Sequence, residues 1–421
     1  MSRKDQRKAP VLRFKGFTDD WEQRKLKDEY QKISNAFVGT ASPFYVEHGH
    51  FYLESNNIKN GQINHDHEVF INDTFYNEQR NKHLHTNDLV MVQSGHVGDS
   101  AVITKRYNNI AAHALIMFQN PKYSETSRFL NYYFQSYNAK KKISVISIGN
   151  TISHILASDM NKFITSFPKS SEQQKIATIF QRIQDLISLQ QRKLDQLKQL
   201  KKAYLSDLFS IKNKPQIRFK GFKGKWKKSK LLDNVSNIID FRGKTPKKLG
   251  MDWSDQGILA LSALNVKDGF IDKSIHAHYG DIKLYNKWMA GNKLHKGQVL
   301  FTTEAPMGNV AQVPDNDKYI LSQRTIAFNV NKDKISDSFL AMLLQTTTVH
   351  NQLLSLSSGG TAKGVSQKSL SGLSVAIPLS LEEQRKMEMT FKYINHLIHF
   401  QQDKIRYLEE NKQFLLQNMF I

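Results

Sequence analysis

Clusters of basic and amide side chains stand on glycine-containing loops at several points of this 421-residue chain. The segment FRGKTPKK carries Arg242, Lys244, Lys247 and Lys248 around a Thr-Pro turn. Arginine and lysine bond phosphates, and arginine, lysine, asparagine and glutamine also bond the edges of bases in a groove. These loops therefore predict contacts with a nucleic acid.

Similar loops occur at matching positions in both halves of the chain. The first half has NAFVGTASP, SNNIKNG, QSGHVG and SIGNTISH; the second adds ALNVKDG, TTEAPMG, LSQRT and SSGGTAKG. Their positions repeat while their side chains differ, as two readers of different sequences require. The candidate nucleic-acid contacts are Asn57, Lys59, Gln93, Ser94, His96, Asn150 and Thr151 in the first half, and Arg242, Lys244, Lys247, Lys248, Asn265, Lys267, Gln323, Arg324, Thr361 and Lys363 in the second.

The sequence predicts no catalytic centre. It has no G-x-x-x-x-G-K-[ST] phosphate loop, and the amino-methyltransferase signature fails because no two prolines are adjacent. Pro314 and Asp315 begin a restriction-nuclease pattern, but no acidic-x-Lys triplet follows within thirty residues. The segments NHDHE (64–68) and HAHY (276–279) lack an ordered set of further ligands, which favours solvated loop histidines over a metal site.

The overall composition also favours a polyanionic partner. The formal net charge is +22, and nucleic acid is the commonest partner of so basic a globular protein, although a basic surface can also serve solubility. Without cysteine the chain has no disulfide, thiolate zinc site or cysteine nucleophile. No run of 18 apolar residues suggests a membrane span, and the charged N-terminus does not resemble a secretory signal, so a cytoplasmic location is expected.

An internal duplication organises the elements that must position these loops. The nonapeptide RFKGFTDDW (13–21) returns as RFKGFKGKW (218–226), and FPKSSEQQKI (167–176) returns as IPLSLEEQRKM (377–387). The offset drifts only from 205 to 211 residues, so the chain contains two similar domains. Within the nonapeptide the aromatic residues recur while Asp19 and its neighbours are replaced, which indicates a packing role rather than a contact surface.

Each copy has a globular part followed by a long helix. Short β-rich runs, turns and helical pieces predict a mixed α/β globular part. The expected boundaries are recognition domain 1 at 1–166, spacer helix 1 at 167–211, recognition domain 2 at 212–376 and spacer helix 2 at 377–421.

Apolar residues in both helical segments recur at alternating steps of four and three, which is coiled-coil spacing. Since the first helix leads directly into the second domain, the two helices are expected to pair antiparallel, with one domain at each end of a rod. Polar residues interrupt the seam at equivalent places, either to fix register or because they lie at its wet edge. The seam includes Ile176, Ile183, Gln190, Leu197 and Lys201 in the first helix, and Ile394, Gln401, Leu408 and Lys412 in the second.

The chain resembles the specificity subunit of type I restriction–modification enzymes over essentially its whole length. The most specific feature is the Pro-x3-4-Glu-Gln turn that opens each long helix, in FPKSSEQQKI and IPLSLEEQRKM. The duplicated RFKGF…W entry and the order domain, helix, domain, helix also fit the family. One departure is that the Gly-x-Thr-Pro turn at 243–246 has only VGTASP as its counterpart, which weakens transfer of loop roles to the first domain.

The resemblance implies a division of labour with other chains. Each globular domain would read one half of a bipartite, asymmetric site in double-stranded DNA. The helices would space the two halves and dock two adenine methyltransferase subunits that bind S-adenosylmethionine. A separate motor and nuclease subunit would use ATP and magnesium, and no cofactor is expected on this chain.

Two other classes of function remain open at this point. One is a stand-alone nuclease or methyltransferase, which would cleave or methylate DNA unaided. The other is an architectural or regulatory DNA-binding protein of the same shape, which would purify without methyltransferase subunits.

Overall fold

The computed structural model describes residues 9–149, 153–209, 215, 217–275, 278–357 and 364–421. The chain forms two compact units. Unit 1 comprises Met1–Gln191 and Asp403–Ile421, and unit 2 comprises Arg192–Gln402. Among the residues that the structure describes, no helix is long and apolar enough to cross a membrane.

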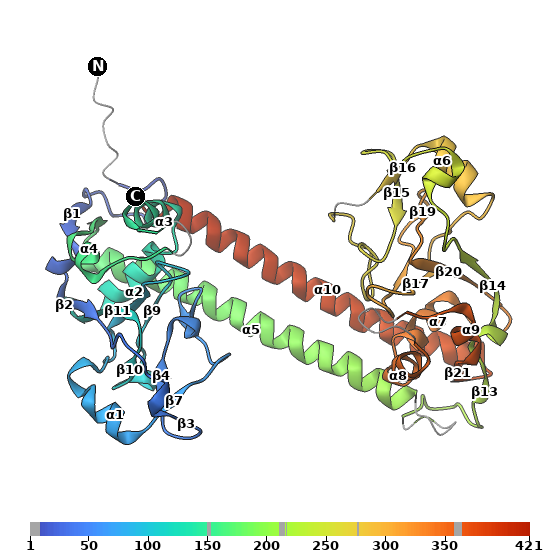
Figure 1. Cartoon of the computed structure of the whole chain (residues 1–421), viewed down its shortest axis with the longest axis horizontal. Coiled ribbons are helices and arrows are strands. Elements are labelled where there is room, and N and C mark those ends of the chain that lie inside the picture. The colour runs from blue at the N-terminus through green and yellow to red at the C-terminus, as the bar shows by residue number, and fades with distance from the viewer. Residues whose placement is uncertain (1–8, 150–152, 210–214, 216, 276–277, 358–363) are drawn as a thin grey trace, which may run out of the picture. The chain divides into compact units, whose positions relative to one another are not determined.

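Unit 1 is built around a four-stranded antiparallel sheet with the order β2-β11-β8-β9. Figure 1 labels three of these strands, β2, β9 and β11. Its central strand β8 (Leu89–Val92) is buried at every residue. Leu89 and Met91 face one apolar cluster, while Val90 and Val92 face another, because successive side chains of a strand point to opposite faces. The uninterrupted run LVMV therefore marks a strand that is covered on both sides. The other strands of the sheet are β2 (Tyr30–Asn35), β9 (Ser100–Val102) and β11 (Leu115–Pro121).

Further small sheets and helices complete unit 1. A second sheet has the order β10-β4-β7-β3, β1 pairs with β12, and β5 pairs with β6. The strands are β1 (Glu22–Lys25), β3 (Tyr45–Val46), β4 (His50–Leu53), β5 (Ile58–Lys59), β6 (Gln62–Ile63), β7 (Phe70–Ile71), β10 (Ala111–Ala112) and β12 (Ile164–Phe167). The short helices are α1 (Asp73–Glu78), α2 (Ser124–Tyr133), α3 (Tyr137–Ile146) and α4 (Ala157–Lys162).

Unit 2 repeats this topology with different side chains. Its main sheet has the order β14-β20-β17-β18, its second sheet the order β16-β15-β19, and β13 pairs with β21. The strands are β13 (Lys227–Lys230), β14 (Val235–Asp240), β15 (Ile258–Leu261), β16 (Tyr279–Gly280), β17 (Val299–Thr302), β18 (Val310–Gln312), β19 (Ile320–Leu321), β20 (Thr325–Val330) and β21 (Ser374–Ile377). The helices are α6 (Ile282–Met289), α7 (Asp337–Leu344), α8 (Thr347–Leu356) and α9 (Gln367–Gly372). The predicted pair of similar mixed α/β domains is thus confirmed.

Two long helices, α5 (Ser170–Leu208) and α10 (Leu381–Asn418), each contribute one part to each unit. In unit 1, Ile176 and Phe180 near the start of α5 share a core with Met419 just beyond the end of α10. In unit 2, the Tyr204 hydroxyl near the end of α5 donates to the Met387 carbonyl near the start of α10, at 3.1 Å. The helices therefore run antiparallel within each unit, as the connectivity predicts.

The repeated nonapeptide closes each unit onto the start of its long helix. Arg13 donates from Nε and Nη2 to the two carboxylate oxygens of Glu172, at 2.7 Å each. In the second copy Arg218 binds Glu383 in the same two-pronged way, at 2.6 and 2.8 Å. Both glutamates are 1% exposed. The arginine of RFKGF and the glutamate of the Pro-x3-4-Glu-Gln turn therefore recur together because they form one buried lock.

The other repeated residues of these motifs are structural as well. Trp21 and Trp226 are buried in the two cores, as the persistence of the aromatic residues predicts. Gln173 donates from Nε2 to the Pro168 carbonyl at 2.9 Å, and Gln384 donates to the Pro378 carbonyl at 3.1 Å. Each glutamine folds its helix start back onto the preceding proline.

Candidate nucleic-acid interface

Four of the loops selected from the sequence meet at one edge of unit 2. Strands β15 and β19 are parallel neighbours, so the segments 262–264 and 322–324 that follow them emerge side by side. Strands β14 and β17 both run antiparallel to β20, so their ends lie beside the start of β20 at the same edge. Between the loops lies a hollow of about 480 Å³, and its lining includes the Thr-Pro turn and Ala305.

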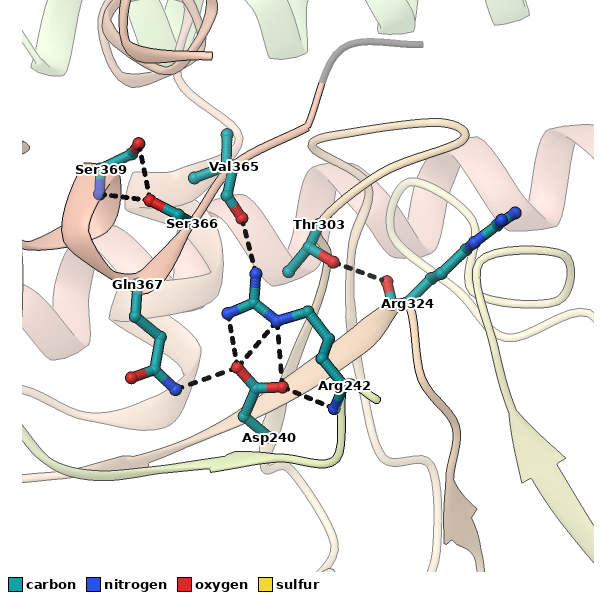
Figure 2. Close-up of polar contacts among 8 residues, drawn as sticks. All are labelled: Asp240, Arg242, Thr303, Arg324, Val365, Ser366, Gln367 and Ser369. Carbon is teal, nitrogen blue, oxygen red and sulfur yellow. Dashed lines mark hydrogen bonds and ion pairs between the residues drawn. The ribbon is translucent and has the colours of Figure 1, made fainter. Parts of the chain in front are cut away.

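Arg242 braces this edge. Its guanidinium donates to Asp240 from Nε at 2.9 Å and to the Val365 carbonyl at 3.1 Å, and Gln367 donates to the same carboxylate at 2.9 Å (Figure 2). Burial raises the pKa of Asp240, but hydrogen bonds from Arg242 and Gln367 outweigh it and leave the pKa below its ordinary value. An ionised Asp240 therefore holds the guanidinium, which stays partly exposed, and a contact between Arg242 and nucleic acid remains a prediction.

Three other predicted contacts also turn toward the protein. The Lys244 ammonium donates to the Trp288 carbonyl at 3.2 Å and lies 4.4 Å from the centre of the Phe241 ring. The Lys248 ammonium donates to the Gly243 carbonyl at 2.7 Å, and the Gln323 amide donates to the Lys244 carbonyl. These bonds shape the Thr-Pro turn, and the contacts of Lys244, Lys248 and Gln323 with nucleic acid remain predictions.

Lys247 and Arg324 are two exposed cations at this edge. The Arg324 guanidinium is solvent-exposed and lies 3.1 Å from the exposed Glu304 carboxylate. Its side chain points away from the Asp240–Arg242 cluster, while its backbone carbonyl accepts a hydrogen bond from the Thr303 hydroxyl (Figure 2). Arginine is suited to the O6 and N7 acceptors of guanine, and glutamate to the N4 donor of cytosine.

The hollow also contains residues that the sequence argument did not select. The rings of Trp253 and His278 stack with centroids 5.3 Å apart and an interplanar angle of 11°. Asp252 and Glu304 bring carboxylates to the same edge. Glu304 lies in the TTEAPMG loop, and its negative charge sets it apart from the basic and amide side chains that predict contacts with nucleic acid. Trp253 and His278 stand 25 positions apart, and no spacing rule joins them.

Two of the predicted contacts lie in the protein interior. Asn57 is 1% exposed and Asn265 is fully buried. Asn265 accepts from the Ser262 amide at 2.7 Å and donates to the Ala260 carbonyl at 3.0 Å, and Asn57 braces the equivalent turn of unit 1 by donating to the His67 carbonyl at 2.8 Å. The structure therefore corrects both predictions: these asparagines recur because they hold the same turn.

The remaining predicted contacts are distributed over the surfaces of the two units. Lys59 and His96 are exposed, while Gln93, Ser94 and Lys267 are partly buried. His96 bonds the Ser55 carbonyl through Nε2 at 3.1 Å. The predictions that fall outside the described residues are those for Asn150, Thr151, Thr361 and Lys363.

The histidine-rich segment of unit 1 forms a local network. The ring of His65 bonds Glu68 through Nδ1 and the Tyr107 hydroxyl through Nε2, the latter at 2.7 Å. Within the ranges that the structure describes, no group of three or more histidine, aspartate or glutamate side chains is placed to hold a metal ion.

The predicted residues of the helix seam are buried or partly buried. Ile176 and Ile394 are buried, as are Gln190 and Gln401, and three other predicted positions are partly buried. These three are Ile183, Leu197 and Leu408.

Each seam lysine attaches its helix to a globular part. Lys412 donates to the side-chain oxygens of Gln135 and Gln184, at 3.0 and 2.9 Å. Lys201 donates to Gln345 at 2.8 Å, and Gln345 is the counterpart of Gln135 in the duplication. Burial lowers the pKa of Lys412 to about 8. The two lysines thus hold the helices to their domains.

Comparison with known proteins identifies this architecture. The model of the type I restriction modification DNA specificity domain matches the chain twice, at residues 18–199 and 223–410. The chain belongs to this family. It is a DNA specificity subunit of a type I restriction–modification system, and this subunit is the non-catalytic one.

Individual relatives agree with the family match. A chain described as a type I restriction enzyme MjaX specificity subunit, from Methanocaldococcus jannaschii, is 21% identical and covers 94% of this chain and 92% of its own length. The crystal structure of the type I restriction–modification S subunit from M. genitalium matches with a TM-score of 0.62 at 13% identity, over 98% of this chain and 99% of that one. A chain from a structure of complex assembly and conformational transition of the type I system matches with a TM-score of 0.55 at 14% identity, over 94% and 96%. At these identities the two structures support the fold alone.

Proposed function

We propose that the two globular domains, residues 1–166 and 212–376, each read one half of a bipartite, asymmetric DNA site. The observation that carries this proposal is the duplicated strand order with different side chains at the loop edge. A repeated framework presents the loops in the same way to two half-sites, and different loop chemistry then selects different bases.

In the second half-site, Arg324 is the principal base-reading candidate. Its guanidinium is exposed at the loop edge and forms a surface ion pair with Glu304. Exposed ion pairs of this kind contribute about 0–1 kcal/mol, so DNA can displace Glu304 at low cost. Lys247 is exposed on the neighbouring turn and is assigned to a phosphate.

The paired helices are proposed to set the unread gap and to dock two adenine methyltransferase subunits. The helix α10 supplies large exposed apolar side chains suited to a protein partner in each unit. These are Met389, Tyr393 and Phe400 in unit 2, and Tyr407 and Phe414 in unit 1. Exposed apolar side chains of this kind on a helix mark a site where another helix packs.

The chemistry belongs to the partner chains in this proposal. The methyltransferase subunits bind S-adenosylmethionine, and a motor and nuclease subunit, where present, uses ATP and magnesium. This chain supplies recognition and assembly, and we place it in the cytoplasm, where such a complex meets the genome.

A domain exchange tests whether each globular domain recognises its half-site independently of the other. Residues 216–375 are replaced by the equivalent segment of a relative with a different target, and the methylated motif is determined by methylation-sensitive sequencing of the host genome. The second half-site should change while the first persists. A change in both half-sites together would contradict the proposal.

An architectural DNA-binding role is distinguished by purification. The full chain, carrying an affinity tag, should co-purify with two methyltransferase subunits and should show no methylation or cleavage of DNA by itself. Purification of a DNA-bound chain without methyltransferase subunits would favour the architectural role.

A further inference from the structure

Beside the reading edge of unit 2 lies a second, basic hollow that the proposed function does not use. It has a volume of about 350 Å³ and lies between α5, α10 and the turn at 268–270. Three lysines of α5, Lys198, Lys201 and Lys202, line it, and the single carboxylate among the lining residues belongs to Asp268. A concave surface with this excess of positive charge favours an anion.

The three lysines differ in availability. Lys201 is held within the protein, because its ammonium donates to Gln345 at 2.8 Å and lies 5.0 Å from the centre of the Phe391 ring. Lys198 and Lys202 are exposed. Residues four apart lie on the same helix face and are separated by about 6 Å along the axis. Their two ammonium groups can therefore flank one phosphate.

The duplication separates the structural lysine from the other two. Lys201 has Lys412 as its counterpart on α10, and both lysines anchor a helix through a glutamine. At the offset of 211 residues, the counterparts of Lys198 and Lys202 are Glu409 and Gln413. Since α10 forms the same kind of helix without them, the exposed lysine pair is not required by the fold.

The hollow is joined to the reading edge by a single loop. Ser262, Ala263 and Leu264 line the reading hollow, while Asp268 and Phe270 line the basic one. Leu264 and Asp268 are four positions apart in the chain, so their Cα atoms lie at most about 14 Å apart. The loop is braced, because the Gly269 amide donates to the Val310 carbonyl at 2.7 Å and the Lys267 amide donates to the Phe270 carbonyl at 2.9 Å.

We propose that Lys198 and Lys202 bind a backbone phosphate of the unread DNA next to the second half-site. A distance of 14 Å corresponds to about four base pairs along a duplex, at about 3.4 Å per base pair. The phosphate therefore lies within about four base pairs of the last base that is read. This inference rests on the proposed function and adds a sequence-independent contact made by the helix α5.

The test uses the full chain assembled with its methyltransferase subunits and a duplex that contains the methylated motif. In Lys198→Gln/Lys202→Gln, the slope of log binding constant against log salt should become shallower by about 0.9, because the two lysines together contact one phosphate and each phosphate contact contributes about 0.9. At 0.1 M salt, affinity should fall by up to about 8-fold, since 0.9 log units apply over the decade below 1 M. The methylated motif should stay the same.

A matched control removes two exposed lysines from α10, in Lys392→Gln/Lys404→Gln. This variant carries the same loss of charge and should keep most of the slope. Phosphate ethylation interference should show one sensitive position in the spacer within about four base pairs of the second half-site, and Lys198→Gln/Lys202→Gln should lose it.

Several results would overturn the inference. An unchanged slope in Lys198→Gln/Lys202→Gln would do so, as would an equal loss in the control. Reduced co-purification of the methyltransferase with unaltered DNA binding would make the hollow a protein contact instead. The proposed function fails separately, if the unmodified complex does not prefer its motif over scrambled DNA.

Discussion

Breaking the buried lock in unit 2 tests why the chain repeats its nonapeptide. The change is Arg218→Ala, which removes both hydrogen bonds to Glu383. Glu383 is 1% exposed, and among the described residues its carboxylate keeps a long hydrogen bond from the Trp226 indole, at 3.4 Å. The mutation therefore leaves a buried charge without its counter-charge.

The size of the effect follows from that burial. Breaking a fully buried ion pair costs about 3–5 kcal/mol, because one charge stays desolvated. Arg218 is partly accessible, with 19% of its side chain exposed, so water can enter the space that the arginine leaves. The position of Glu383 in the first turn of α10 adds some compensation from the helix dipole. We therefore expect a loss of about 2–4 kcal/mol in the free energy of unfolding of unit 2.

The assay is a double-mutant cycle followed by urea unfolding of the full chain. Glu383→Gln and the double variant complete the cycle, and Arg13→Ala gives the equivalent perturbation in unit 1. The double variant should be more stable than the sum of the single changes predicts, by at least about 1 kcal/mol. Additive effects, or a loss below about 0.5 kcal/mol for Arg218→Ala, would refute the lock as the reason for the repeat.

Three further predictions concern function and pH. Arg324→Ala should relax base preference in the second half-site at a cost of about 1–3 kcal/mol. Lys247→Ala should instead weaken binding to all duplexes alike and reduce the salt slope by about 1. Binding to duplexes with the motif and with a scrambled sequence measures both effects, and equal losses on the two duplexes for Arg324→Ala would remove Arg324 from the reading surface. Burial lowers the pKa of Lys412 from 10.5 to about 8, so the folded state loses this proton at a lower pH than the unfolded state does. The free energy of unfolding of unit 1 should therefore rise between about pH 8 and 10.5, and Lys412→Met should abolish this rise. The same dependence of unfolding free energy on pH in both proteins would contradict the prediction. Tyr393→Ser/Phe400→Ser should lower co-purification of the methyltransferase. Because both side chains are exposed, the free energy of unfolding of the free chain should change by no more than about 0.5 kcal/mol. Undiminished co-purification would exclude these side chains of α10 from the docking site.

Periodicity and repetition in the sequence were sufficient to predict the architecture. The offset of 205 to 211 residues predicts two similar domains, and alternating steps of four and three predict two long helices that pair. Both predictions are confirmed, because burial imposes the same spacing on any chain that forms these elements. The persistence of Trp21 as Trp226 likewise predicts a place in the core.

The roles of individual polar side chains were decided only by the tertiary structure. Asn265 and Arg242 stand on loops of suitable composition, yet one is buried in a turn and the other is held by Asp240. The type of a side chain determines which bonds it can make, whereas the fold determines which partner occupies it first.

The reading edge illustrates the same limit. Its four loops are separated by tens of residues and meet because β14, β15, β17, β19 and β20 are neighbours in two sheets, and strand order depends on long-range pairing that local patterns do not encode. Repetition in the sequence determined that there are two domains and two helices. Only the folded chain decided which repeated residues brace the framework and which cations, such as Arg324 and Lys198, are left facing outward, because burial and hydrogen bonding are properties of the assembled tertiary structure.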